Sequence, residues 1–165
     1  MNIKRIIRHL SASNAAMRRI FPQAALNNIE RTIAEVEQTH AGQIRFAVED
    51  ALDLKPLLEG QTARERAIEV FSRLRVWDTE QNNGVLIYLL LADRDVEIVA
   101  DRGVHARLGQ PVWEAVCQEM EGAFRQGKFE EGAIAGIRSV GAHLARHYPY
   151  TGSKTNELPD RPVLI

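Results

Sequence analysis

The chain has 165 residues, a formal net charge of -1, and 45% hydrophobic and 26% charged side chains. This length and balance are typical of one globular domain, which buries roughly 70% of its unfolded surface, and they exclude a disordered or fibrous protein. The longest apolar run, residues 85–92, has eight residues, whereas a transmembrane helix needs about 20. A pI of about 6.5 and the lack of a recognisable binding motif argue against nucleic acid as a partner.

The sequence favours a reducing compartment. The single cysteine, Cys117, cannot form an internal disulfide, and its place between apolar residues indicates a core side chain rather than a nucleophile. The first twenty residues lack the continuous apolar stretch of a secretory signal. We therefore expect a cytoplasmic protein without a transmembrane segment.

Residues 1–20 form a basic leader segment. They hold five Lys or Arg residues and no Asp or Glu, so the remainder carries about -6 by difference. Ile3, Ile6, Ile7 and Leu10 fall at helical spacing. A basic amphipathic start of this kind can contact an anionic membrane surface peripherally or bind an acidic partner. The alternative is a frayed helix whose basic face is solvated.

The first predicted elements are a helix, a strand and a loop. Apolar residues recur at helical spacing from Pro22 to about His40, which predicts a helix. Residues 43–49 then alternate polar with apolar side chains, as in a half-buried strand. Residues 54–60 contain Pro56 and end in a glycine, so we expect a loop there.

A second helix and a buried strand follow. Thr62 and Glu65 have the spacing of a capping box, which predicts a helix that ends near Trp77. Residues 84–91 are apolar without alternation, which is typical of a strand buried on both faces of a sheet. Because a helix separates this strand from residues 43–49, we expect the two strands to be parallel.

The remaining pattern completes the predicted fold. A tight turn leads to a third, antiparallel strand at 96–100, and helices are predicted from Pro111 to Gly127 and over 129–147. Residues 149–165 contain three prolines and scattered charge, so an extended or disordered tail is expected. The prediction is a three-layer α/β/α sandwich with a mixed sheet flanked by helices, in one domain over residues 21–148.

Four features in this order resemble the TPM domain family. They are Asn82-Asn83-Gly84 before the apolar strand, the Asp95–Val99 strand after a charged turn, Gly103, and the aromatic and glycine pattern from Phe124 to Gly132. The similarity covers roughly residues 24–147. Many relatives have Gly-Tyr-Gly where this chain has Asp101-Arg102-Gly103.

The resemblance implies a TPM-like domain over residues 21–148, in a short cytoplasmic member of bacterial type. A thylakoid relative is associated with acid phosphatase activity and photosystem repair, and bacterial relatives with membrane-linked proteins. Two functions are therefore implied: a binding or assembly module that acts with a membrane-associated partner, and a weak metal-dependent acid phosphatase acting on phosphomonoesters.

The predicted hairpin locates a candidate site from the residues alone. A two-residue turn at 93–94 pairs Ala92 with Asp95. Counting outward then places Leu86 opposite Asp101. The chain before the second strand and the chain after the third therefore lie side by side at the open end of the hairpin.

Polar side chains gather at this open end. They are Asp78, Glu80, Asn82 and Asn83 before the second strand, and Asp101, Arg102 and His105 after the third. Carboxylate and amide oxygens are the ligands that calcium and magnesium prefer. We predict a divalent metal or phosphate site with Asp78 and Asp101 as its main ligands. Asn82 or Asn83 would add an amide oxygen, and Arg102 would hold a phosphate oxygen.

If the protein is a phosphatase, His105 is the candidate general acid, because imidazole titrates near neutral pH. The structural alternative is that these side chains only cap turns and form exposed ion pairs.

A second acidic cluster is predicted at the opposite end of the sheet. Its members are Glu49, Asp50, Asp53, Asp93 and Asp95. Ligands of open α/β sheets often bind beyond the carboxyl ends of parallel strands, which favours this end. No glycine-rich phosphate loop accompanies it, so a solvated acidic rim is the alternative.

Overall fold

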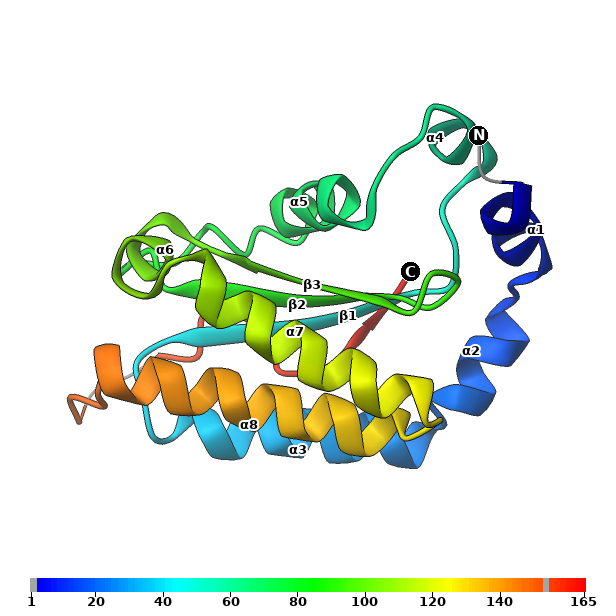
Figure 1. The fold of residues 1–165 in the computed structure, drawn as a ribbon. Coiled ribbons are helices and arrows are strands. Elements are labelled where there is room, and N and C mark those ends of the chain that lie inside the picture. Colours follow the sequence, from blue (N-terminus) through cyan, green and yellow to red (C-terminus); the bar gives the residue numbers. More distant parts are fainter. Residues whose placement is uncertain (1–2, 153–154) are drawn as a thin grey trace.

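The computed structural model describes residues 3–152 and 155–165, so Met1 and Asn2 of the leader and two residues of the tail lie outside the described part. Figure 1 shows the order of the elements along the chain. They are α1 (Ile3–Ser11), α2 (Asn14–Ile20), α3 (Gln23–Glu37), β1 (Gln43–Glu49), α4 (Leu54–Leu58), α5 (Ala63–Arg73), β2 (Gly84–Leu90), β3 (Asp95–Ala100), α6 (Arg102–Leu108), α7 (Gln110–Arg125), α8 (Phe129–His147) and β4 (Val163–Leu164).

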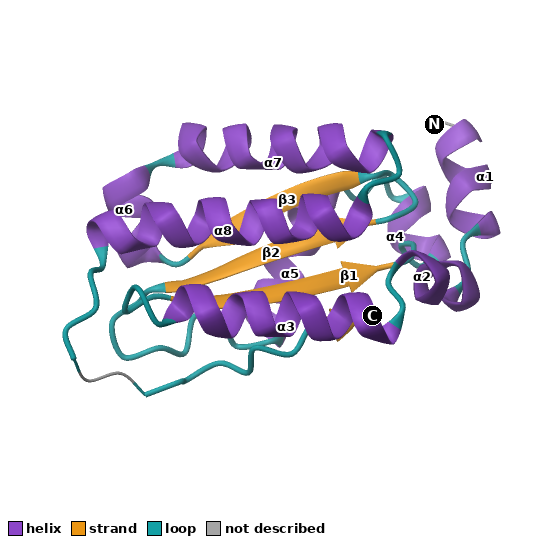
Figure 2. Ribbon diagram, turned by 90° about the horizontal axis from the view of Figure 1, so that it is seen from below, coloured by secondary structure: helices purple, strands orange, loops and turns teal. Residues whose placement is uncertain are grey.

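The four strands form one mixed sheet in the order β3-β2-β1-β4. β1 pairs with β2 and β4 in parallel, and β2 pairs with β3 antiparallel. Helices α3, α7 and α8 lie side by side across one face, whereas α5 covers the other (Figures 1 and 2). The predicted three-layer α/β/α architecture with a mixed sheet is therefore confirmed.

Two hydrophobic clusters hold the layers together. Successive side chains of a strand point to opposite faces, so β2 contributes to both clusters. Val85, Ile87 and Leu89 pack with α3, α7 and α8, and the residues between them pack with α5. Every residue of β2 is buried, as its unbroken apolar run predicts.

Two segments outside the predicted helices are short helices. α4 lies in the predicted loop at 54–60, and its Pro56 sits in the first turn, where a missing amide is harmless. α6 directly follows β3 and is capped by Asp101, whose side chain accepts a hydrogen bond from the backbone amide of Arg102. Both helices are too short to show a clear apolar period, which explains why the periodicity does not reveal them.

The predicted register of the hairpin is wrong by two residues. Asp95 pairs with Leu90 rather than with Ala92, and the strands are joined by residues 91–94. The amides of Leu91 and Ala92 donate to carbonyls at the end of β1, so they continue the parallel pairing and are not available to β3. A shift of two leaves each side chain on its predicted face.

The tail adds the fourth strand. The amides of Glu157 and Leu158 donate to the side chain of Gln43, and the amide of Ile165 donates to the carbonyl of Val48. Within the tail, residues 155–165 are therefore bound along β1. A strand of two residues gives no readable alternation in the sequence.

A buried ion pair joins the sheet to α5. The carboxylate of Glu49 accepts from Arg66 at 2.8 and 2.9 Å and from the hydroxyl of Tyr88 at 2.7 Å. Donating hydrogen bonds to Glu49 raises the pKa of Arg66, and burial together with this carboxylate raises the pKa of Tyr88. The three groups therefore satisfy one another beneath α5, and Arg66 also pairs with the exposed Glu69 at 2.9 Å.

We predict that Glu49→Ala lowers the free energy of unfolding by up to about 3 kcal/mol, because it leaves the half-buried Arg66 cation with only the exposed Glu69 as its partner and leaves the Tyr88 hydroxyl without an acceptor. Urea denaturation measures this loss. Tyr88→Phe is the matched control, since it removes one hydrogen bond and costs only about 1 kcal/mol. Equal losses in the two variants would contradict the central role of the carboxylate.

Candidate functional site

The two chain segments of the predicted site lie side by side. The amide of Asp101 donates to the carbonyl of Gly84 at 2.9 Å, which joins the end of β3 to the start of β2. A Cβ atom at Gly103 would lie 2.6 Å from the carbonyl oxygen of Asn82, so only glycine fits at this approach. The geometry expected from the hairpin is thus present despite the shifted register.

Asp101 is the buried carboxylate of this region. It is 5% exposed, and its Oδ1 accepts from the Arg102 amide at 2.6 Å. Its Oδ2 is buried and has no hydrogen-bond partner within the described ranges. Burial raises the pKa of Tyr148; Arg107 opposes this rise and the Asp101 carboxylate adds to it, so the tyrosine lies within electrostatic reach.

Asn83 supplies a second buried oxygen. The residue is 1% exposed. Its side-chain Nδ2 donates to the carbonyl of Ala41 at 2.9 Å, and its backbone amide donates to the hydroxyl of Thr79 at 3.1 Å. These bonds fix the side chain so that Oδ1 is the free acceptor, and this atom has no donor among the residues that the structure describes. Its neighbour Asn82 is half-buried with φ 49°, a left-handed conformation that asparagine tolerates.

The other predicted residues lie at the surface. Asp78 forms an exposed ion pair with Arg75 at 2.6 Å, and no described contact joins it to Asp101. Arg102 and His105 are exposed in the first turn of α6, and the amide of His105 donates to the carbonyl of Asp101. The structure therefore brings the segment of Asn82 and Asn83 beside the segment of Asp101 and Arg102 and leaves Asp78 with a local partner.

Neutral oxygens dominate this site. Within residues 3–152 and 155–165, no group of three or more His, Cys, Asp or Glu side chains is placed to hold a metal ion. A cation here would depend on one carboxylate, the Asn83 amide oxygen and backbone carbonyls. The carbonyl oxygens of Gln81 and Asn82 both face Gly103, and the hydroxyl of Tyr148 lies beside them. Sequence reasoning missed Tyr148, because no pattern links it to a loop so distant in the chain.

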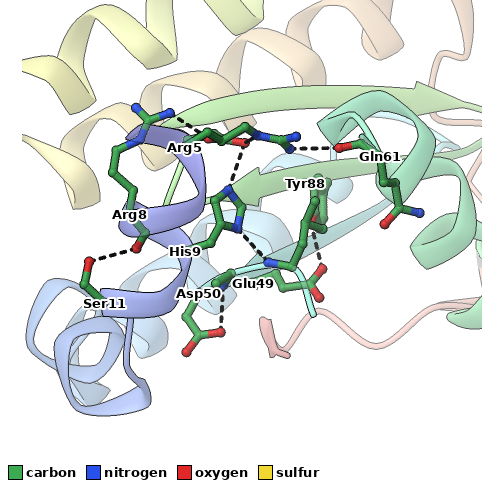
Figure 3. Close-up of polar contacts among 11 residues, drawn as sticks. Arg5, Arg8, His9, Ser11, Glu49, Asp50, Gln61 and Tyr88 are labelled. Carbon is green, nitrogen blue, oxygen red and sulfur yellow. Dashed lines mark hydrogen bonds and ion pairs between the residues drawn. The ribbon is translucent and has the colours of Figure 1, made fainter. Parts of the chain in front are cut away.

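The second acidic cluster binds cations of the chain itself (Figure 3). Asp93 accepts from Arg5 at 2.8 Å and from Arg8 at 2.9 Å, and His9 lies 3.2 Å from the same carboxylate. Glu49 is held by Arg66, as described above. Opposite charge in the leader and in this cluster is the sequence signal for this contact.

A pocket of about 460 Å³ lies beneath the joint between α1 and α2, at the carboxyl ends of β1 and β2. Its lining includes Arg8, Ser13, Met17, Asp50 and Arg94. The leader therefore covers the edge of the sheet where α/β proteins often bind ligands.

Asp95 is a carboxylate in an unfavourable environment. Burial raises its pKa to about 6; Glu97, Glu121 and Asp93 add to the rise, and Arg5 opposes it. The native state therefore holds this proton at a pH where the unfolded chain has lost it. The contribution of Asp95 to the free energy of unfolding is therefore most favourable below about pH 4 and is lost as the pH rises through 6.

We predict that Asp95→Asn raises the free energy of unfolding at pH 7.5 by roughly 1 kcal/mol, a small value because solvent screens a half-buried charge. The gain should disappear at pH 4, where the wild-type carboxyl is neutral in the native state. Urea denaturation at the two pH values measures it, with the exposed Glu119→Gln as the control. A gain that is the same at both pH values would contradict the assignment.

Comparison with known proteins agrees with this architecture. A family model described as TPM domain matches residues 16–143. The solution structure of the BA42 protein from the psychrophilic bacterium Bizionia argentinensis is similar, with a TM-score of 0.76 and 27% identity over 86% of this chain and 93% of that one. The N-terminal domain of a protein from P. gingivalis shares the fold, with a TM-score of 0.62 and 16% identity over 79% of this chain and 82% of that one.

No curated protein matches the chain. The family model nevertheless spans well over half of the sequence, from α2 to α8, and includes both segments of the candidate site. The chain therefore belongs to the TPM domain family.

Proposed function

We propose that the protein is a TPM-type binding module that takes up calcium or magnesium between the loop before β2 and the start of α6. In this proposal it acts in the cytoplasm with a membrane-associated partner. The observation that carries the cation site is the pair of buried oxygens, Asp101 Oδ2 and Asn83 Oδ1, which have no donor among the described residues.

Such oxygens are costly in an apolar interior. A buried acceptor without a donor costs about 1–3 kcal/mol, and more when it is charged. A hard cation removes this cost, because carboxylate, amide and carbonyl oxygens are its preferred ligands. Asp101 would supply the charge, and Asn83 and the carbonyls of Gln81 and Asn82 would supply neutral oxygens.

The expected affinity is low. Sites with few charged ligands bind calcium with a Kd of about 10⁻⁴–10⁻³ M. Asp78 would become a second carboxylate ligand only by leaving Arg75, and an exposed ion pair of that kind is worth roughly 0–1 kcal/mol. A weak site with a recruitable second carboxylate therefore fits the residues present.

We predict that isothermal titration of the protein with calcium or magnesium releases or absorbs heat in the millimolar range. Asp101→Asn should weaken this binding at least about tenfold because it removes the one buried charge, while asparagine still caps α6. Asp78→Asn is the matched control and should change the affinity by less than about threefold. No heat with either metal, or unchanged affinity in Asp101→Asn, would sink the cation site.

A second candidate function is a weak metal-dependent acid phosphatase. The observation that favours it is the exposure of Arg102 and His105 on the turn that Asp101 caps. In this alternative Arg102 holds a phosphate oxygen and His105 protonates the leaving group. Phosphoryl transfer also needs a positioned nucleophile or activated water and strong charge compensation. A single carboxylate and one exposed arginine offer little of either, so the binding module is the better-supported function.

We predict no turnover of a generic phosphomonoester above background between pH 5 and 7, with either metal present, because no nucleophile is positioned. The assay should include Asp101→Asn and His105→Asn. Turnover that is lost in both variants would establish the phosphatase and reject a purely binding role.

A further inference from the structure

Helix α1 carries most of its apolar side chains outward, and only Ile6 is partly buried, against the hydrophobic cluster beneath α5. Ile3, Ile7 and Leu10 are 64%, 61% and 64% exposed, and they lie at positions that form one stripe on a helix. A surface helix of a globular protein normally buries such a stripe and exposes its polar face. In α1, three of the four isoleucine and leucine side chains are exposed instead.

The polar face of α1 is held by specific contacts (Figure 3). Arg5 donates to Asp93 and to the carbonyl of Gln61, both at 2.8 Å. His9 is 4% exposed, and its Nδ1 accepts from the amide of Leu52 at 3.0 Å. Its Nε2 lies 3.2 Å from the Asp93 carboxylate. α1 cannot turn its stripe inward without breaking these contacts.

A neighbouring helix exposes further apolar side chains. α4 contacts α1, and the two helices lie close together at one end of the molecule in Figures 1 and 2. Leu54 and Leu58 of α4 are each 52% exposed. Together with Ile3, Ile7 and Leu10 they form what we call the apolar patch. It contains five of the eight large exposed hydrophobic side chains of the described residues, so these are concentrated here rather than scattered.

We propose that the apolar patch docks on the surface of an anionic lipid bilayer, with α1 lying in the plane of the interface. The positive charge comes from the leader, where Lys4, Arg18 and Arg19 are exposed; on α4 the exposed Lys55 lies 4.0 Å from the exposed Glu59, so that pair adds no net charge. The leader as a whole has no acidic residue. Aliphatic side chains beside lysine and arginine are the composition of helices that bind at membrane interfaces.

Charge and length support this occupant over others. A second copy of the chain would place one basic leader against another, which is unfavourable. α1 has nine residues and is about 14 Å long, less than half of the hydrocarbon thickness. Over the described ranges, no helix is long and apolar enough to cross a bilayer. The helix can therefore lie on a membrane but cannot span it.

This inference deepens the proposed function and rests on its membrane-associated role, but it does not need the cation site. Co-sedimentation of the full chain with vesicles tests it, in the presence of EDTA so that cation binding plays no part. One set of vesicles contains phosphatidylcholine alone, and the other contains about one third phosphatidylserine. We expect binding to the anionic vesicles only, and weaker binding at high salt.

The double variant Ile7→Ser/Leu10→Ser should bind anionic vesicles at least about tenfold more weakly, because the apolar area available to the bilayer is reduced. Lys4→Glu, which leaves the stripe intact, should also weaken binding. Ile68→Ser is the matched control, since Ile68 is 47% exposed on α5, outside the patch, and its loss should have no effect. Thermal melts of all variants establish that each is folded.

Several outcomes would overturn the proposal. They are no binding of the wild type to anionic vesicles, equal binding to both kinds of vesicle, or full binding by the double variant. Analytical ultracentrifugation without lipid adds one more: a dimer that Ile7→Ser/Leu10→Ser abolishes would assign the patch to a second copy. Calcium titration of the same variants reports on the cation site alone, so a failure of membrane binding can be told apart from a failure of cation binding.

Discussion

The burial of β2 is the constraint on which the rest of the structure depends. This strand lies between β1 and β3 and is covered by helices on both faces, so each of its backbone and side-chain groups must find a partner inside the protein. At its start, Gly84 packs against the backbone of Val76 with no room for a side chain, and its carbonyl accepts from Asp101. The loop before β2 and the start of α6 are thereby pressed together.

The acidic and buried oxygens at the two ends of the sheet have different partners. At the end where β2 begins, buried oxygens of Asn83 and Asp101 lack donors among the described residues, which suits a cation from solution. At the opposite end, Asp93 and Glu49 are bound by arginines of the chain itself. The leader is thus both a source of positive charge for the sheet and the carrier of an exposed apolar stripe.

Strong local patterns made most of the fold predictable. The unbroken apolar run of β2 predicted its burial, and the capping box of Thr62 and Glu65, which is present at the start of α5, predicted that helix. The hairpin register failed because the end of β1 holds Leu91 and Ala92, a long-range contact that no turn rule contains. A two-residue strand such as β4 has too few side chains to show a period.

The candidate site was partly predictable for the same reason. Both the predicted register, with Leu86 opposite Asp101, and the observed one, with Val85 opposite Ala100, place Asn83 within a few residues of Asp101. The sequence placed Asp78 in the site because it lies close to Asn82 along the chain. Its ion pair with Arg75 could not be read from that spacing. The orientation of α1 was not predictable, because periodicity reveals an apolar stripe but not which face of the helix docks.

An amide-resolved NMR titration with calcium tests the central claim most directly, since it reports where a weakly bound ion sits. The account predicts concentration-dependent shifts at Asn82, Asn83 and the segment from Asp101 to Gly103, with little change around Asp93. Shifts confined to the opposite end of the sheet, or no shifts at millimolar calcium, would contradict it.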